Sequence, residues 1–108
     1  MAFRLVARKP TGGGNIVTSS TNITTSAYVE YVTALGKACT AIQFNNGTDK
    51  TLILATGAAG SEVDTGLYLY PGISPLIPIE IAKGKRVALK SLSGTASSGA
   101  VTMNFLGG

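Results

Sequence analysis

Residues 38–55 read ACTAIQFNNGTDKTLILA, and this stretch decides the fold class. Side chains at alternate positions of an extended strand share one face, which here carries Ala38, Thr40, Ile42 and Phe44. Asn45-Asn46-Gly47 then predicts a tight hairpin turn, because Asn and Gly tolerate positive φ angles. The apolar run TLILA at 51–55 is typical of a short buried strand. The stretch therefore predicts two strands joined as a hairpin.

The same alternation recurs along most of the chain, with Gly, Pro, Ser or Asn between the runs. It is found at residues 3–8, 63–70, 77–81, 86–90 and 101–105. Residues 27–35 show some helical spacing, but their Val and Tyr content favours a strand. Pro75 and Pro78 place the neighbouring strand at a sheet edge.

About eight short antiparallel strands at nearly regular spacing predict an all-β protein. Such strands form a β-sandwich or a barrel, and we expect a single β-sandwich, of either the jelly-roll or the immunoglobulin-like kind. The segment KPTGGGN at 9–15 interrupts regular structure, since Pro and three Gly residues disfavour it. We therefore expect residues 1–15 to be a flexible N-terminal arm and residues 16–108 to be the β-sandwich domain.

The chain offers few groups for catalysis. It contains no histidine, so the commonest general base and metal ligand is absent. Ordinary Ser or Cys triads and zinc sites built from His and Cys are thereby excluded. The lone Cys39 is flanked by small residues and is expected to be buried. We predict no enzymatic activity, no catalytic or metal-binding residues and no cofactor.

Glu62 and Asp64 are the two acidic residues closest together in the sequence. On a strand they would share a face, with their carboxylates roughly 6–7 Å apart at a rise of about 3.3 Å per residue. That separation lies between the carboxylate separations of retaining and inverting glycosidases, so it indicates neither kind of site. With 6% aromatic residues and no Trp, the chain has little surface for stacking on sugars. The preferred interpretation is a solvated loop entering a strand, or a polar contact to a neighbouring chain.

The composition points to a subunit that packs against other proteins. Charged residues make up 13% of the chain, so Thr, Ser, Asn, Gly and apolar groups must face outward. The alternative is a monomer with a hydroxyl-rich surface. The net charge of +4 favours acidic partners, but the basic residues are scattered, so direct nucleic-acid binding is not expected.

The sequence shows no membrane or secretion signal. No apolar run approaches the roughly 20 residues of a membrane span, and the first residues, MAFRLVARKP, lack a signal-peptide core. We therefore expect no membrane partner. The protein is expected to be made in the cytoplasm and to leave it, if at all, by assembly or lysis.

Two long segments carry a resemblance to a known group of proteins. They are AIQFNNGTDKTLILATGAAGSEVDTGLYLYPG at 41–72 and PIEIAKGKRVALKSLSGTASSGAVTMNFLG at 78–107. Their shared features are an Asn-Gly turn, the GAAGSE loop, a Pro-Gly turn, the RVALKS strand, SGTASSG and the closing NFLG. From about Thr33 to Gly107 the chain resembles small β-sandwich virion proteins of tailed bacteriophages.

The resemblance implies a capsid decoration, or cement, protein on the outer surface of the phage head. Such a protein binds the major capsid protein non-covalently, in many copies, and stabilises the shell. It is also expected to associate with itself as a dimer or trimer. Two other functions stay open: a neck, tail or fibre-base component, and a carbohydrate- or host-binding module.

Five residues are candidates for contacts with the capsid or with neighbouring subunits. Capsid exteriors are commonly acidic, so Arg4, Arg8 and Lys9 on the N-terminal arm are expected to anchor there. Tyr68 and Tyr70 are expected to supply rigid interface area, because tyrosine buries much surface at little entropic cost. The alternative is that both tyrosines cover the outer face of one sheet.

Overall fold

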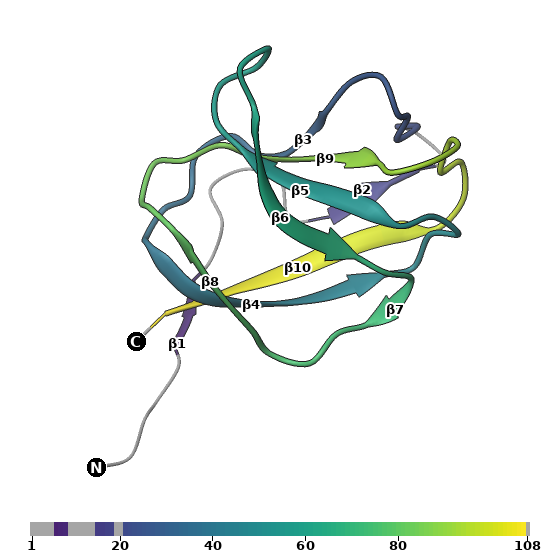
Figure 1. Cartoon of the computed structure of the whole chain (residues 1–108). Helices are drawn as coiled ribbons and strands as arrows, with labels where there is room; N and C mark the ends of the chain where they lie inside the picture. Colours follow the sequence, from purple (N-terminus) through teal and green to yellow (C-terminus); the bar gives the residue numbers. More distant parts are fainter. Residues whose placement is uncertain (1–5, 9–14, 19–20, 108) are drawn as a thin grey trace.

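The alternating runs of the sequence form the strands of two packed antiparallel sheets (Figure 1). The computed structural model describes residues 6–8, 15–18 and 21–107. The strands in these residues are β1 (Val6–Arg8), β2 (Asn15–Val17), β3 (Val29–Val32), β4 (Cys39–Asn46), β5 (Leu52–Thr56), β6 (Val63–Leu69), β7 (Gly72–Ile73), β8 (Ile77–Ile81), β9 (Val87–Ser91) and β10 (Ala100–Gly107). The predicted all-β sandwich is confirmed.

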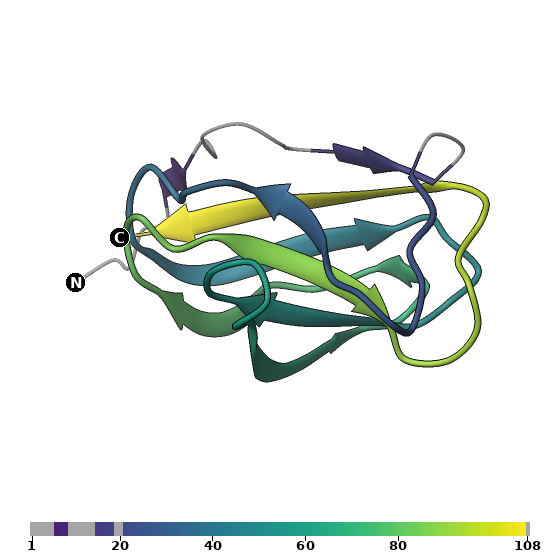
Figure 2. The same ribbon diagram turned by 90° about the horizontal axis from the view of Figure 1, so that it is seen from above.

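The strand order identifies the kind of sandwich. One sheet has the order β1-β10-β4-β7, with β2 also paired to β10 and β8 to β4, and the other has the order β3-β9-β5-β6. Figure 2 shows β1 and β2 following one another along β10, so they form one interrupted edge. β7 and β8 share β4 in the same way. If β1 and β2 are counted as one strand and β7 and β8 as another, the sandwich has eight strands in chain order. The two sheets then have the orders 1-8-3-6 and 2-7-4-5, which is a jelly roll rather than an immunoglobulin-like fold.

The turn at Asn45-Asn46-Gly47 does not make a hairpin, and that prediction is wrong. β4 and β5 lie in different sheets, so the chain crosses between the sheets here. The buried Asn46 amide donates hydrogen bonds of 2.8 Å to the backbone oxygens of Lys50 and Leu69. No non-glycine residue in the described part of the chain has a positive φ, so Asn46 does not adopt the predicted turn conformation. It serves as a buried hydrogen-bonding centre instead.

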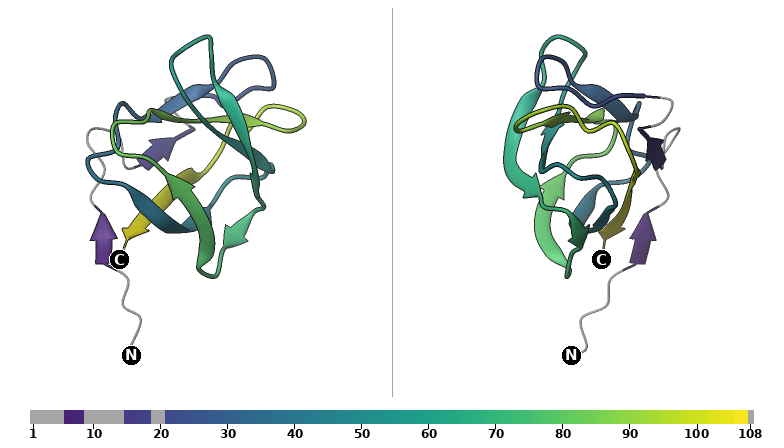
Figure 3. Two further views of the ribbon diagram at one scale, coloured as in Figure 1. Left: turned by 60° about the vertical axis from the view of Figure 1, so that its left-hand side comes forward. Right: turned by 90° about the vertical axis from the view of Figure 1, so that its right-hand side faces the viewer.

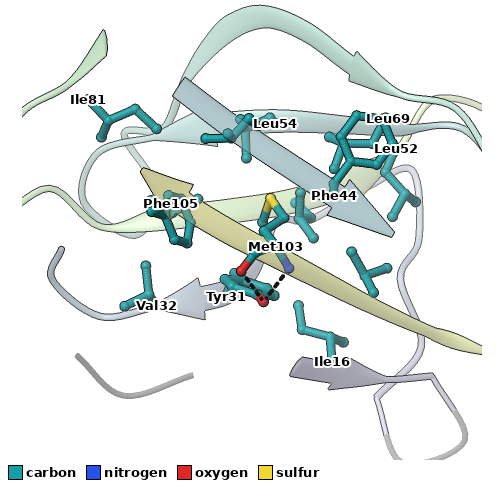
Figure 4. Close-up of a cluster of buried hydrophobic side chains, with 14 of the residues drawn as sticks. Ile16, Tyr31, Val32, Phe44, Leu52, Leu54, Leu69, Ile81, Met103 and Phe105 are labelled. Atoms are coloured by element: carbon teal, nitrogen blue, oxygen red, sulfur yellow. Dashed lines mark hydrogen bonds between the residues drawn. The ribbon is translucent and has the colours of Figure 1, made fainter. Parts of the chain in front are cut away.

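The core lies between the sheets and is built from the inward positions of the alternating strands (Figure 4). The inward face predicted for the last strand is confirmed, since Val101, Met103 and Phe105 are all buried. The face predicted at the start of residues 38–55 is only partly correct. Ala38 and Thr40 are exposed, because the pairing of β4 with β8 shifts register between Cys39 and Ala41.

A buried tyrosine bridges the two sheets. Along the edge of β10, β2 pairs with residues 100–102 and β1 with residues 105–107, which leaves Met103 and Asn104 between them. The Tyr31 hydroxyl, from β3 in the other sheet, accepts a bond of 2.7 Å from the Met103 N–H and donates one of 3.4 Å to its carbonyl (Figure 4). The phenol therefore supplies the partner that a continuous edge strand would otherwise provide.

The predicted flexible arm overlaps the sheet, so that boundary needs correction. Val6–Arg8 forms β1, which pairs with β10, and the two strands lie side by side in both views of Figure 3. Asn15 already belongs to β2. The rest of the predicted arm, residues 1–5 and 9–14, lies outside the described residues. The sandwich thus includes a strand from the segment that the sequence assigned to the arm.

Candidate interaction surface

Glu62 and Asp64 do not face one another as a carboxylate pair. Glu62 precedes β6, and its side chain, which is 9% exposed, meets the Arg86 guanidinium at 2.8 Å. Asp64 lies in β6 and accepts a hydrogen bond of 2.7 Å from the Gly66 N–H. This arrangement fits the interpretation of a loop that enters a strand. The partner of Glu62 belongs to the same chain and is neither solvent nor a neighbouring subunit.

Arg86 holds together three parts of the second sheet. Its Nε contacts Glu30 in β3 at 2.9 Å, and its Nη1 also donates to the Gly57 carbonyl at 3.4 Å. Hydrogen bonds from Arg86 and Thr33 lower the pKa of Glu30. The pKa of Glu62 is lowered by its own backbone N–H and by Arg86. The cluster therefore fastens the loop at 57–62 to the sheet.

The edge of the sandwich where β6 leads into β7 and β8 (Figure 1) carries an apolar ridge. We define it by the exposed Tyr70, Ile73 and Leu76, which are 64%, 76% and 48% exposed, and by the half-buried Leu67, Ile77 and Ile79. No charged residue occurs between Asp64 and Glu80. The ridge thus gathers three of the exposed large apolar side chains in one segment without charged residues, which is typical of a protein contact.

The strands beneath the ridge are poor templates for an added strand. β8 is an edge strand, as predicted, and its Pro78 offers no N–H group. In β6 the register to β5 shifts, and Gly66 adopts a φ of 82°. The Thr65 hydroxyl replaces a backbone donor there by bonding to the Leu54 carbonyl at 2.8 Å. These interruptions favour contact through side chains rather than through extension of a sheet.

A shallow hollow lies beside the exposed residues of the ridge. It has a volume of about 250 Å³ and is formed where β6 faces β8. Its lining residues are Thr65, Gly66, Leu67, Ile77, Pro78 and Ile79. Protruding apolar side chains and an apolar recess therefore occur on the same edge of the sandwich.

The two candidate tyrosines lie in different environments. Tyr68 is half-buried, and its register partner in β5 is the buried Ile53, so it helps to cover the outer face of the second sheet. Tyr70 follows β6 and belongs to the ridge. The sequence did not single out Ile73 and Leu76, although the charge-free segment and its prolines were the available signal.

The candidate basic residues are only partly described. Arg4 and Lys9 lie outside the described residues, and of Arg8 only the backbone pairing with Phe105 is defined. This pairing places β1 near the C-terminal end of β10 (Figure 1). Whether the three basic side chains contact a partner stays a prediction.

Exposed lysines occur at the same end of the sandwich. Lys37 lies in the loop before β4, and Lys83 and Lys85 lie in the loop after β8. The loops are joined by a bond of 2.8 Å from the Leu35 N–H to the Lys85 carbonyl, and by a bond of 2.7 Å from the Gly84 N–H to the Leu35 carbonyl. The basic residues scattered in the sequence thus partly converge.

The outer face of the first sheet is polar and uncharged around a second hollow. Its lining residues are Gln43, Phe44, Asn45, Ile73, Thr102 and Asn104. The pairing of β4 with β10 brings the amides and the hydroxyl side by side, and Thr102 also contacts Asn15 at 3.0 Å. Such a face can both donate and accept hydrogen bonds.

Within the described residues, no metal site or membrane-spanning helix accompanies these surfaces. In residues 6–8, 15–18 and 21–107, no group of three or more His, Cys, Asp or Glu side chains is placed to hold a metal ion. Cys39 is buried, as predicted, and burial raises the pKa of its thiol. The described part of the chain has no helix long and apolar enough to cross a membrane. No protein-family model, curated protein or solved structure matches the chain.

Proposed function

We propose that this protein is an adhesive structural subunit of a tailed-phage particle. Its role would be that of a decoration protein, which binds the major capsid protein lattice and stabilises the head shell. The observation that carries the proposal is the apolar ridge, because an exposed uncharged patch on a well-packed domain is typical of protein–protein contact. The jelly roll also occurs in lectin domains and cupins, so the fold alone does not decide the function.

The basic end of the molecule supports attachment to an acidic shell. β1, which contains Arg8, lies near the loops of Lys37, Lys83 and Lys85. Long-range attraction between this end and acidic capsid groups would orient the subunit as it approaches. Each contact can be weak, since many copies bind the same lattice.

The direct test is binding to expanded, undecorated shells of the phage that encodes the chain. Purified protein is mixed with the shells, and bound copies are located by cryo-electron microscopy. Many copies spread over the shell are expected. A single ring at one vertex would instead indicate a neck component, and no bound density on shells or tails would refute the virion proposal.

A charge variant tests the basic end without removing any backbone. The triple variant Arg4→Gln/Arg8→Gln/Lys9→Gln should bind the shell at least about tenfold more weakly at low salt. The control is Lys50→Gln, which alters a lysine paired with Asp49 at the other end of the sandwich. Equal binding by the triple variant and the control would contradict the assignment of these residues.

A second candidate function is glycan binding, favoured by the polar outer face of β4 and β10. Its amides and hydroxyls match the donors and acceptors of a neutral sugar. Glycan-array binding that is lost in Asn104→Ala, with the fold intact, would support this function. Absence of array binding together with shell binding would leave the decoration role.

A further inference from the structure

We propose that the apolar ridge is the surface through which two copies of this chain associate about a two-fold axis. This inference deepens the proposed function by naming the partner of the ridge. Tyr70, Ile73 and Leu76 are its protruding members. The charge distribution and the shape of the edge point to a second copy as the occupant.

The charge distribution favours association at the ridge. Each copy carries a formal net charge of +4, so two copies repel one another over most approaches. The segment between Asp64 and Glu80 contains no charged residue, so the ridge residues themselves bring no basic side chain to a contact there. A charged partner surface would lose its hydration against the ridge without gaining an ion pair. The identical ridge of a second copy avoids both the repulsion between basic groups and the lost hydration of a charged partner.

The shape of the edge is self-complementary. A two-fold interface uses the same patch on both subunits, so any protrusion of the patch must be matched by a recess in it. Here the exposed Leu76 is followed directly by Ile77, which lines the hollow of about 250 Å³ between β6 and β8. Two antiparallel ridges would place a protruding aliphatic side chain of each copy in the hollow of the other.

A ridge of this kind would make a weak dimer rather than a permanent one. The largest apolar patch on a typical monomeric protein exposes roughly 300–600 Å². Two such patches would bury about 600–1,200 Å², at the lower limit for specific interfaces. The interrupted β6 and the proline in β8 add no backbone pairing. We expect a Kd of about 10–100 μM, which becomes effective when copies are held side by side on a lattice.

Sedimentation velocity from low micromolar to millimolar concentration tests the proposal with no shell present. The wild type should convert from monomer to dimer. Leu76→Glu should weaken the dimer at least about tenfold, because burying an unpaired carboxylate is costly. Ile73→Glu should act in the same direction. The control is Val17→Glu, since Val17 is 41% exposed, close to Leu76 at 48%, but lies in β2, at the opposite edge of the first sheet from β7 and β8.

The outcomes separate this inference from the proposed function. A wild type that stays monomeric at millimolar concentration, or that forms a trimer, overturns the two-fold ridge contact even if shell binding persists. Equal weakening by Val17→Glu and Leu76→Glu also overturns it. A ridge-dependent dimer that binds no shell supports the contact and refutes the decoration role. Thermal melting of each variant confirms that the fold is retained.

Discussion

At the scale of single residues, the Tyr31 hydroxyl completes a sheet to which its own strand does not belong. The sequence placed residues 27–35 in a strand, and β3 confirms that prediction for Val29–Val32. The hydroxyl's role was not predictable, because it depends on β1 and β2 pairing with separate parts of β10. Local alternation carries no information about such a gap, which arises from contacts between distant parts of the chain.

Replacing Tyr31 by phenylalanine should therefore destabilise the fold. The ring, whose centroid lies 6.0 Å from that of Phe105, would stay, but the buried Met103 N–H would lose its bond to the hydroxyl. We expect the free energy of unfolding to fall by about 1–3 kcal/mol, measured by urea denaturation. Tyr70→Phe, on the exposed ridge, should change it by less than about 0.5 kcal/mol. Similar losses in both variants would contradict this role of Tyr31.

The same hydroxyl should make stability depend on alkaline pH. Burial raises the pKa of Tyr31 above the ordinary value near 10, because desolvation disfavours the phenolate. The resulting stability is fully present below pH 10 and is lost as the pH rises through the folded-state pKa. The wild type should thus lose stability more steeply above pH 10 than Tyr31→Phe. The buried Cys39 thiol titrates in both proteins, so the difference between them isolates the phenol.

At the scale of elements, Arg86 controls the loop between β5 and β6. Arg86→Gln should release the loop at 57–62, and its amide hydrogens should exchange about tenfold faster. The lowered pKa values of Glu30 and Glu62 contribute stability above about pH 4.5, which is lost as the pH falls through the folded-state values.

Melting temperatures between pH 7 and pH 3 should therefore decline more steeply in the wild type than in Arg86→Gln. Lys85→Gln is the matched control, because Lys85 precedes Arg86 and is exposed. If Lys85→Gln loses the pH dependence to the same extent as Arg86→Gln, the role of Arg86 in fastening the loop at 57–62 is contradicted. Unchanged exchange at residues 57–62 in Arg86→Gln would contradict it as well.

The elements themselves were largely predictable, whereas their partners were not. The alternating runs at 77–81 and 101–105 became β8 and β10, because burial of one face imposes a period of two. The Asn-Gly signal failed because buried hydrogen bonds to Lys50 and Leu69 fix Asn46 in a crossover between sheets. The ridge was missed because each of its residues alone looks like ordinary core.

At the scale of the whole molecule, the jelly roll sets the first strand beside the last. β10 pairs with β1 along residues 105–107 and with β4 along its other edge. This end of the sandwich also carries the loops with Lys37, Lys83 and Lys85. Val6–Arg8, which the sequence assigned to an arm, is therefore both part of the sheet and part of the basic end. Deleting this segment alters the stability of the sheet and the charge of that end together.

Removing residues 1–8 should lower the stability of the fold, independently of any effect on shell binding. The deletion strips β1 from β10 and exposes backbone groups along residues 105–107. We expect the free energy of unfolding to fall by about 2–3 kcal/mol, at roughly 1 kcal/mol per lost hydrogen bond, while near-UV circular dichroism shows a retained fold. The variant Arg4→Gln/Arg8→Gln/Lys9→Gln keeps the backbone and should match the wild type in stability. If the truncated protein is as stable as the full chain, the pairing of β1 contributes nothing to stability. Only in that case can a loss of shell binding by the truncated protein be attributed to the removed charges.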